Sequence, residues 1–135
     1  MMNAYEKALK LLKIRPHHSA ELTKKLLMRG FGKSDIEGVI KKLQDQNLVD
    51  NDQFAQMYLD ELLRNKVLGY FGFKAKLMQR GIPSDEADSL LKRTVSLERE
   101  RMNAAKIAEK EEDKRKLVYK LQSRGFRSEI INDFI

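Results

Sequence analysis

Three stretches of this sequence share one pattern: Lys25-Leu26-Leu27-Met28-Arg29-Gly30-Phe31, Lys76-Leu77-Met78-Gln79-Arg80-Gly81-Ile82 and Lys120-Leu121-Gln122-Ser123-Arg124-Gly125-Phe126. Each reads Lys-Leu-x-x-Arg-Gly-apolar. A glycine that follows a helical pattern can adopt a positive φ without a Cβ penalty, and the helix then ends in a Schellman turn. In the first copy Gly30 would be the C′ residue, and Leu26 would touch Phe31 across the turn. The pattern therefore predicts three helices that end in the same turn.

A serine with an acidic residue behind it follows each of the three glycines. Serine is a favoured N-cap, and acid in the first turn complements the helix dipole. Ser34 and Glu37 have the full spacing of a capping box. We therefore expect each turn to join two helices, the second of them capped by Ser34, Ser84 or Ser128, and Ser19 to cap the helix before the first turn.

The repeated pattern divides the chain. Its copies begin at residues 25, 76 and 120, which indicates three modules, 1–50, 51–95 and 96–135. Apolar residues recur with helical spacing throughout, and each module is expected to hold three helices. So small a unit buries too little surface to be stable alone. The sequence predicts an all-α fold of three tandem three-helix, helix-turn-helix-like repeats that pack on one another in an elongated array.

Two segments carry more specific expectations. Residues 96–112 are densely charged, so we expect a helix that begins at Ser96 and is largely exposed. In the second module, Phe54, Met57 and Tyr58 have the spacing of a buried helical stripe and are expected in the core. Asp50 stands ahead of them with capping-box spacing to Gln53.

The composition offers little for catalysis. The chain has no cysteine, which excludes disulfides, thiol nucleophiles and thiolate zinc sites. His17 and His18 follow Pro16 without patterned carboxylates, so we expect loop residues rather than metal ligands. Neither a Walker loop nor a dinucleotide-binding fingerprint is present. We expect no enzymatic activity, no cofactor and no metal.

Charge and hydropathy narrow the class of partner. No stretch has the apolar length of a signal-peptide core or a membrane span, which together with the missing cysteine predicts a soluble, cytoplasmic protein. The net charge is +7, from 27 basic and 20 acidic residues, and the basic excess is spread over all three modules. An anionic partner, either nucleic acid or a protein bound to it, is favoured over a membrane.

The repeated pattern also places a lysine and an arginine four residues apart on one helix face. Two interpretations stay open from the spacing alone. The arginines could compensate the helix dipole while the lysines are merely solvated. Alternatively, the pairs form a basic line along an elongated protein that follows phosphates or an acidic groove. The pairs are Lys25 with Arg29, Lys76 with Arg80, and Lys120 with Arg124.

The stretch Gly69-Tyr70-Phe71-Gly72-Phe73 precedes the second copy. Two glycines could cradle a phosphate, but amid aromatic residues they indicate a helix start with close packing. The aromatic rings could stack on bases of a single strand or lie in the core. Of the three, Tyr70 is expected to be the most exposed.

Taken in order, these motifs resemble the bacterial RecX regulatory proteins, which modulate the RecA recombinase. No single motif is specific, but their order and spacing are, and together they cover nearly the whole chain. The similar stretches are Ser19-Ala20-Glu21-Leu22 through Leu26 to Gly30-Phe31, the linker Leu48-Val49-Asp50, Phe54-Ala55 with Tyr58 and Arg64, Gly69 through Leu77 to Arg80-Gly81-Ile82, and the third Leu-x-x-Arg-Gly-Phe.

The resemblance implies a curved, monomeric, non-enzymatic array of three-helix repeats. It further implies binding in the helical groove of the RecA filament on single-stranded DNA, with inhibition of filament growth, ATP hydrolysis and strand exchange. Where the family often has Gly-Pro and then a basic residue, this chain has Gly69-Tyr70 and Gly72, so position 72 offers no basic contact. Carried over by position, the contact surface comprises Lys66, Gly69, Tyr70, Lys74, Lys76 and Arg80, with Lys25, Arg29, Lys120 and Arg124 from the outer modules.

Other classes of function stay open. Paired helices joined by a glycine turn also resemble helix-turn-helix units, which predicts direct binding to single-stranded or double-stranded DNA with a steep dependence on salt. Against this, the helices expected at 34–46 and 84–94 lack a row of Arg, Asn or Gln suited to base edges. A purely structural helical scaffold is the third alternative.

Overall fold

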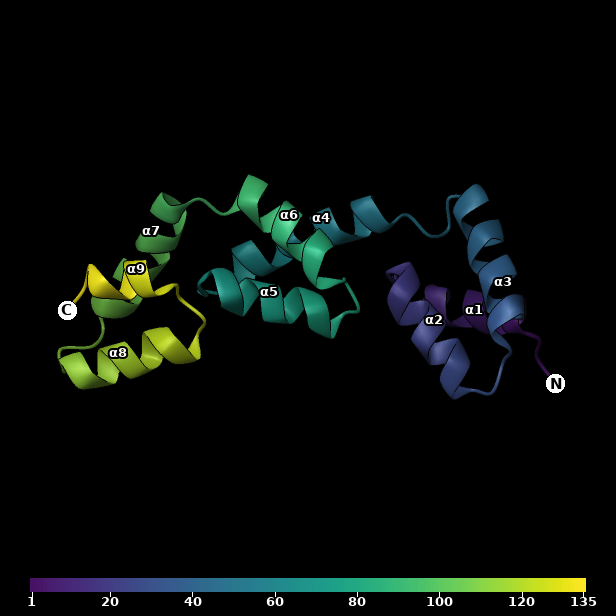
Figure 1. The fold of residues 1–135 in the computed structure, drawn as a ribbon, viewed down its shortest axis with the longest axis horizontal. Coiled ribbons are helices and arrows are strands. Elements are labelled where there is room, and N and C mark those ends of the chain that lie inside the picture. The colour runs from purple at the N-terminus through teal and green to yellow at the C-terminus, as the bar shows by residue number, and fades with distance from the viewer.

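The computed structural model describes residues 1–135 and contains nine helices and no strand, which confirms the all-α fold class. The helices succeed one another in three groups of three along the longest axis, and the two termini lie at opposite ends of a gently arched array (Figure 1). The helices are α1 (Ala4–Ile14), α2 (Ser19–Met28), α3 (Lys33–Asp45), α4 (Asn51–Asn65), α5 (Tyr70–Gln79), α6 (Ser84–Thr94), α7 (Leu97–Ala108), α8 (Lys114–Ser123) and α9 (Ser128–Asn132).

The hydrophobic core consists of three separate clusters, one in each group of helices. We refer to residues 1–50, 51–95 and 96–135 as repeats 1, 2 and 3. The buried apolar side chains run from Ala8 to Val49 in repeat 1, from Ala55 to Val95 in repeat 2, and from Ala104 to Ile131 in repeat 3. The boundaries of the three repeats as folding units stay a prediction.

The three turns have the predicted geometry. Gly30, Gly81 and Gly125 have φ values of +88°, +88° and +77°. The N–H of the apolar residue after each glycine donates to the leucine carbonyl five residues earlier, at 3.3, 3.2 and 3.1 Å. These are the hydrogen bonds of a Schellman motif. A residue with a Cβ at the glycine position, in the left-handed region, would lower the stability by about 1–2 kcal/mol. The repeated glycine is therefore required by the turn itself.

The expected serine caps after the turns are wrong. Helices α3, α6 and α9 are preceded by Gly32, Pro83 and Arg127, and none of these starts has a side-chain cap bond. Only one extended residue separates the apolar residue that closes each glycine turn from the next helix. Ser34, Ser84 and Ser128 therefore already lie in the first turn of helices α3, α6 and α9. The cap predicted at Asp50 is confirmed, since its carboxylate accepts from the N–H of Gln53 at 3.0 Å. Ser96, where a helix was expected to begin, caps α7 by accepting from the N–H of Arg99 at 3.1 Å.

Repeat 3 docks its glycine turn on the start of α5. The N–H of Gly69 donates to the carbonyl of Arg124 at 3.0 Å, and that of Phe71 donates to the carbonyl of Gly125 at 2.8 Å. A Cβ on Gly69 or on Gly72 would overlap the backbone of this turn. The predicted close packing at these two glycines is therefore confirmed, and it joins two repeats.

The expectation that residues 96–112 are largely exposed is wrong for one face of α7. Glu100 is 0% exposed, and Asn103 and Ala104 are buried beside it. The Glu100 carboxylate accepts from the backbone N–H of Tyr70 at 2.9 Å and from that of Arg127 at 3.0 Å. It also accepts from Nε of Arg127 at 2.6 Å. The buried carboxylate of Glu100 thus links repeat 3 to repeat 2 by hydrogen bonds.

Repeats 1 and 2 meet at the start of α2. His18 is buried, and its Nδ1 accepts from the N–H of Ala20, so His18 caps α2 in place of Ser19. Since Nδ1 accepts, Nε2 carries the proton and donates to the carboxylate of Glu86 in α6 at 2.8 Å. Ser19 and Asn51 exchange two further hydrogen bonds, of 2.8 and 2.7 Å. The two histidines belong to a connecting segment, as expected, but both are buried.

Candidate partner-binding surface

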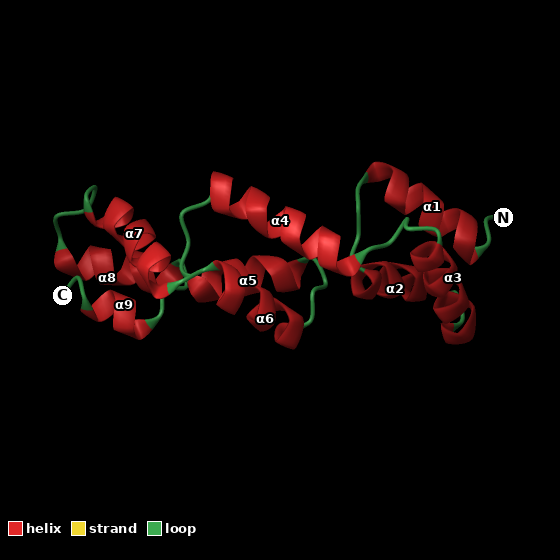
Figure 2. Ribbon diagram, turned by 90° about the horizontal axis from the view of Figure 1, so that it is seen from above, coloured by secondary structure: helices red, strands yellow, loops and turns green.

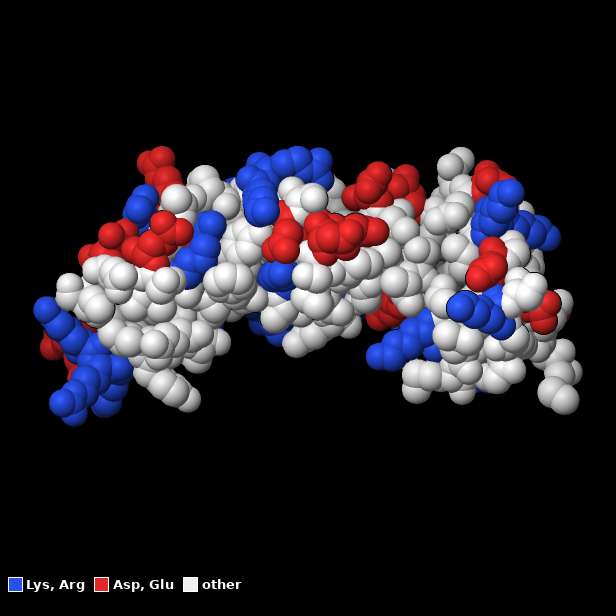
Figure 3. All heavy atoms as spheres, viewed as in Figure 1, with Lys and Arg blue, Asp and Glu red and all other residues white.

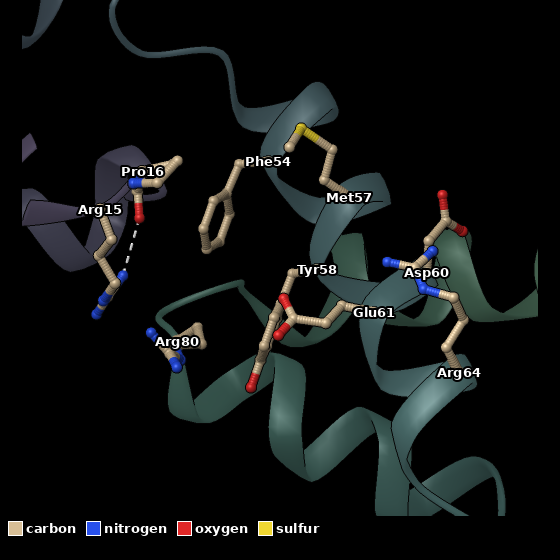
Figure 4. A pocket seen from close by; sticks show the side chains of 9 residues that line it. All are labelled: Arg15, Pro16, Phe54, Met57, Tyr58, Asp60, Glu61, Arg64 and Arg80. Atoms are coloured by element: carbon tan, nitrogen blue, oxygen red, sulfur yellow. Dashed lines mark hydrogen bonds between the residues drawn. The ribbon is translucent and has the colours of Figure 1, made fainter.

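Three of the predicted contact residues come together on repeat 2. Lys66, Lys76 and Arg80 line a shallow pocket of about 180 Å³ at the end of α4. The pocket shares Tyr58, Glu61 and Arg80 with a larger groove of about 440 Å³ that reaches repeat 1. We call the two together the α4 trough. Its larger part is lined by Arg15, Pro16, Phe54, Met57, Tyr58, Asp60, Glu61, Arg64 and Arg80 (Figure 4).

Helix α4 supplies the floor of the trough. It runs along one side of repeat 2, with α5 and α6 opposite (Figure 2). Ala55, Leu59 and Leu62 form its buried face. The expectation that Phe54, Met57 and Tyr58 all lie in the core is wrong, because α4 carries a second apolar stripe beside the first. Phe54 and Tyr58 are half-buried at the edge of the core, and Met57 is 56% exposed.

Arg80 lines both parts of the trough from the end of α5. Its guanidinium lies 5.0 Å from the centre of the Tyr58 ring, and that ring stacks on Phe54 at 6.0 Å. A cation over an aromatic ring contributes about 0.5–1 kcal/mol at an exposed site. No carboxylate lies within ion-pair distance of Arg80. The ring therefore holds the side chain in place while its charge stays available.

Arg15 and Pro16 form the edge that belongs to repeat 1. Arg15 donates to both oxygens of Glu21, at 3.0 and 2.7 Å, and to the carbonyl of Pro16 at 2.9 Å. Burial alone would raise the pKa of the Glu21 carboxyl, but the bonds and charge of Arg15 outweigh it and lower that pKa. The guanidinium is thus fixed by an intramolecular partner (Figure 4).

Gly69, Tyr70 and Lys74 lie away from the trough. Tyr70, expected to be the most exposed ring, is only 5% exposed, whereas Phe71 is 53% exposed. The correction follows from the hydroxyl of Tyr70, which donates to Asp88 at 2.8 Å while Lys74 binds the same carboxylate at 3.0 Å. Burial and then Asp88 raise the pKa of Tyr70 to about 12. Tyr70 and Lys74 are thus bonded within repeat 2, and Gly69 is bonded to the glycine turn of repeat 3.

The four basic residues predicted in the outer repeats are spread apart. Lys25 donates to Nε2 of His17 at 2.7 Å, and Lys120 pairs with Glu111 at 3.0 Å. Arg29 and Arg124 are C-cap residues, as the dipole interpretation requires. Basic and acidic side chains are interspersed over most of the face drawn in Figure 3, apart from a basic cluster at the end that holds α8. Of the ten predicted contact residues, three therefore come together in the trough, and the four in the outer repeats do not join them.

The sequence reasoning missed Arg15 and Met57 as parts of this surface. A sequence signal for Met57 was present, because an apolar stripe beside a complete buried stripe cannot also face the core. Arg15 gave no such signal, since the groove exists only where repeat 1 meets α4.

Comparisons with known proteins agree with the fold. The model of the RecX first three-helix domain matches residues 4–43. The regulatory protein RecX of Chlorobium limicola is 33% identical over 134 residues, which cover 95% of this chain and 84% of that protein. The regulatory protein RecX of Chlorobaculum tepidum is 33% identical over 138 residues, which cover 98% and 86%.

A solved structure shows the same arrangement of helices. The crystal structure of RecX from Lactobacillus salivarius superposes with a TM-score of 0.83 at 23% identity, covering 97% of this chain and 91% of that one. No helix combines the length and the apolar character needed to cross a bilayer. No cluster of three or more potential metal-ligating side chains occurs.

Proposed function

This chain belongs to the RecX family of regulatory proteins, and from that premise we propose that it binds the RecA recombinase filament on single-stranded DNA. Bound there, it inhibits filament growth, ATP hydrolysis and strand exchange. The observation that carries the proposal is the family match, which extends over 95% of this chain and 84% of a named relative. A match of that length reaches into all three repeats.

The architecture supports a partner that is itself extended. The repeats follow one another along an arched array instead of folding back into a ball (Figure 1). Such solenoid-like arrays present long surfaces to extended partners. The net charge of +7 favours an assembly that carries exposed acid or phosphate. We place the contact at the α4 trough, with Lys66, Lys76 and Arg80 as its charged residues.

The test is the single-stranded-DNA-dependent ATPase of a RecA recombinase, measured with and without this protein. We expect inhibition at protein concentrations too low to coat the bare DNA. Full ATPase activity at every concentration below saturation of the DNA would overturn the proposal.

Direct DNA binding is a second candidate, favoured by a feature of repeat 3. Helix α8 contains four basic residues and no acidic residue. Lys114, Arg115 and Lys116 are exposed and have no ion pair, and Tyr119 is 72% exposed on the same helix. Basic side chains gather at this end of the molecule (Figure 3). Phosphates with a stacked base would suit that face, and binding to bare DNA that weakens steeply with salt would support it.

A further inference from the structure

The α4 trough is chemically different at its two ends. The end against repeat 1 holds the apolar side chains of Pro16, Phe54, Met57 and Tyr58, beside the charged side chains of Arg15, Asp60 and Arg64. The other end is lined by three basic side chains, those of Lys66, Lys76 and Arg80, together with Glu61 and Asn65. Since Tyr58 and Arg80 belong to both parts, the surface is continuous from the apolar end to the cationic end.

The apolar end is open to solvent. Met57 is more than half exposed, and Figure 4 shows Pro16 and Phe54 facing one another across an opening. A methionine thioether is flexible and polarisable, so it adapts to apolar side chains of different shape. Nothing within the chain covers this side of α4. Burying an apolar side chain of a partner at this end would therefore favour binding.

The cationic end keeps a net positive charge, because Glu61 is the one acidic residue among three basic ones there. Lys66, Lys76 and Arg80 have no carboxylate within ion-pair distance. Of the acids in the trough, Asp60 accepts from Gln56 at 2.9 Å and Glu61 stands alone. Carboxylates of a partner would find an arginine capable of bidentate binding and two lysines beside it.

Nucleic acid fits the same surface less well. The Tyr58 ring is already engaged by Phe54 and Arg80, so it is not free to stack on a base. A phosphate chain carries charge at every nucleotide and would bring it beside Asp60 in the larger part of the trough as well as beside Glu61. A peptide carries carboxylates only at chosen positions. The charge pattern therefore favours a protein segment.

We propose that the α4 trough binds a peptide segment of the recombinase that carries an apolar side chain followed by carboxylates. The apolar side chain packs on Met57 and Phe54, and the carboxylates bind Lys76, Arg80 and Lys66. This inference rests on the proposed function, since it names the part of the filament that repeat 2 recognises. It also fixes the direction of the segment, whose apolar residue lies towards repeat 1.

The test compares two trough variants with two matched controls. Met57→Glu removes the apolar contact and repels the carboxylates, and Lys76→Glu reverses one charge of the cationic end. Met102→Glu, at a 61% exposed methionine of α7, and Lys106→Glu, at an exposed lysine of the same helix, make the same changes outside the trough. Each is measured for binding to RecA filaments and, separately, to the same single-stranded DNA without recombinase. Circular dichroism checks that helix content is retained.

We expect each trough variant to weaken filament binding by about tenfold or more, and each control to leave it within about twofold. Met57→Leu should keep wild-type binding because it preserves the apolar contact. Unchanged filament binding in both trough variants would overturn this inference and leave the proposed function standing. An equal loss of binding to bare DNA in Lys76→Glu would overturn it in favour of phosphate. Failure of the unaltered protein to bind filaments would overturn both proposals.

Discussion

Replacing Glu100 by alanine should loosen repeat 3 from repeat 2. The Glu100 side chain is fully buried and accepts three hydrogen bonds, two from backbone N–H groups and one from the guanidinium of Arg127. Alanine leaves all three donors without an acceptor. Nη2 of Arg127 is already buried without a hydrogen-bond partner, so no second protein acceptor stands ready for the guanidinium.

The size of the effect follows from these contacts. Removing one partner of a buried ion pair costs about 3–5 kcal/mol. The Arg127 side chain is 24% exposed, so water reaches part of it and the lower end of that range, about 3 kcal/mol, is appropriate. Since whole domains are stable by about 5–15 kcal/mol, this is a large fraction of the total.

Urea unfolding followed by far-ultraviolet circular dichroism measures the loss. With a slope of about 1–3 kcal/mol per molar urea, the midpoint should fall by about 1–3 M. The matched control is Glu112→Ala, at an exposed carboxylate without an ion pair, which should change stability by less than about 0.5 kcal/mol. Hydrogen exchange at the amides of Tyr70 and Arg127 should accelerate in Glu100→Ala. A midpoint equal to that of the control would refute the role assigned to this carboxylate.

Two further outcomes are expected. Gly81→Ala and Gly30→Ala share the same φ of +88°, and each should lose about 1–2 kcal/mol from strain. Gly81→Ala should lose more stability, because its Cβ would lie 2.8 Å from the backbone nitrogen of Glu21, whereas the Cβ of Gly30→Ala meets open space. Equal decreases in melting temperature would show that repeats 1 and 2 are not packed together at Gly81 as described. Burial lowers the pKa of His17 in the folded protein. As the pH drops below about 6.5, the unfolded chain therefore binds a proton at His17 more readily than the folded protein does, and the free energy of unfolding should fall. His17→Asn should flatten that slope in urea titrations between neutral and mildly acidic pH, and an unaltered slope would exclude His17 as its source.

The fold was predictable where its causes are local. Each turn depends on a glycine and on a hydrogen bond between residues only five apart, so the repeated pattern was enough to place the turn and the helix before it. The serine caps failed for an equally local reason. A closed Schellman turn leaves one extended residue before the next helix, and the serine lies beyond it.

The errors about burial have a different cause, because they depend on contacts between distant segments. Glu100 is buried by donors 30 and 27 residues away, and no pattern within a charged helix indicates such partners. Tyr70 is buried because its hydroxyl reaches Asp88 across the repeat. Lys66 was named from the resemblance, and Lys76 and Arg80 from the repeated pattern as well. The groove that joins them to Arg15 arises only when two repeats meet.

The dependence of binding on the recombinase tests the central claim most directly. Fluorescently labelled protein is titrated with RecA filaments on single-stranded DNA, held by a slowly hydrolysed ATP analogue, and with the same DNA alone, at low and at physiological salt. The filament-regulator function predicts binding to the filament that persists at physiological salt, where binding to bare DNA is lost. Equal affinity for the filament and for bare DNA, falling together as salt rises, would contradict it and make the array a nucleic-acid-binding module.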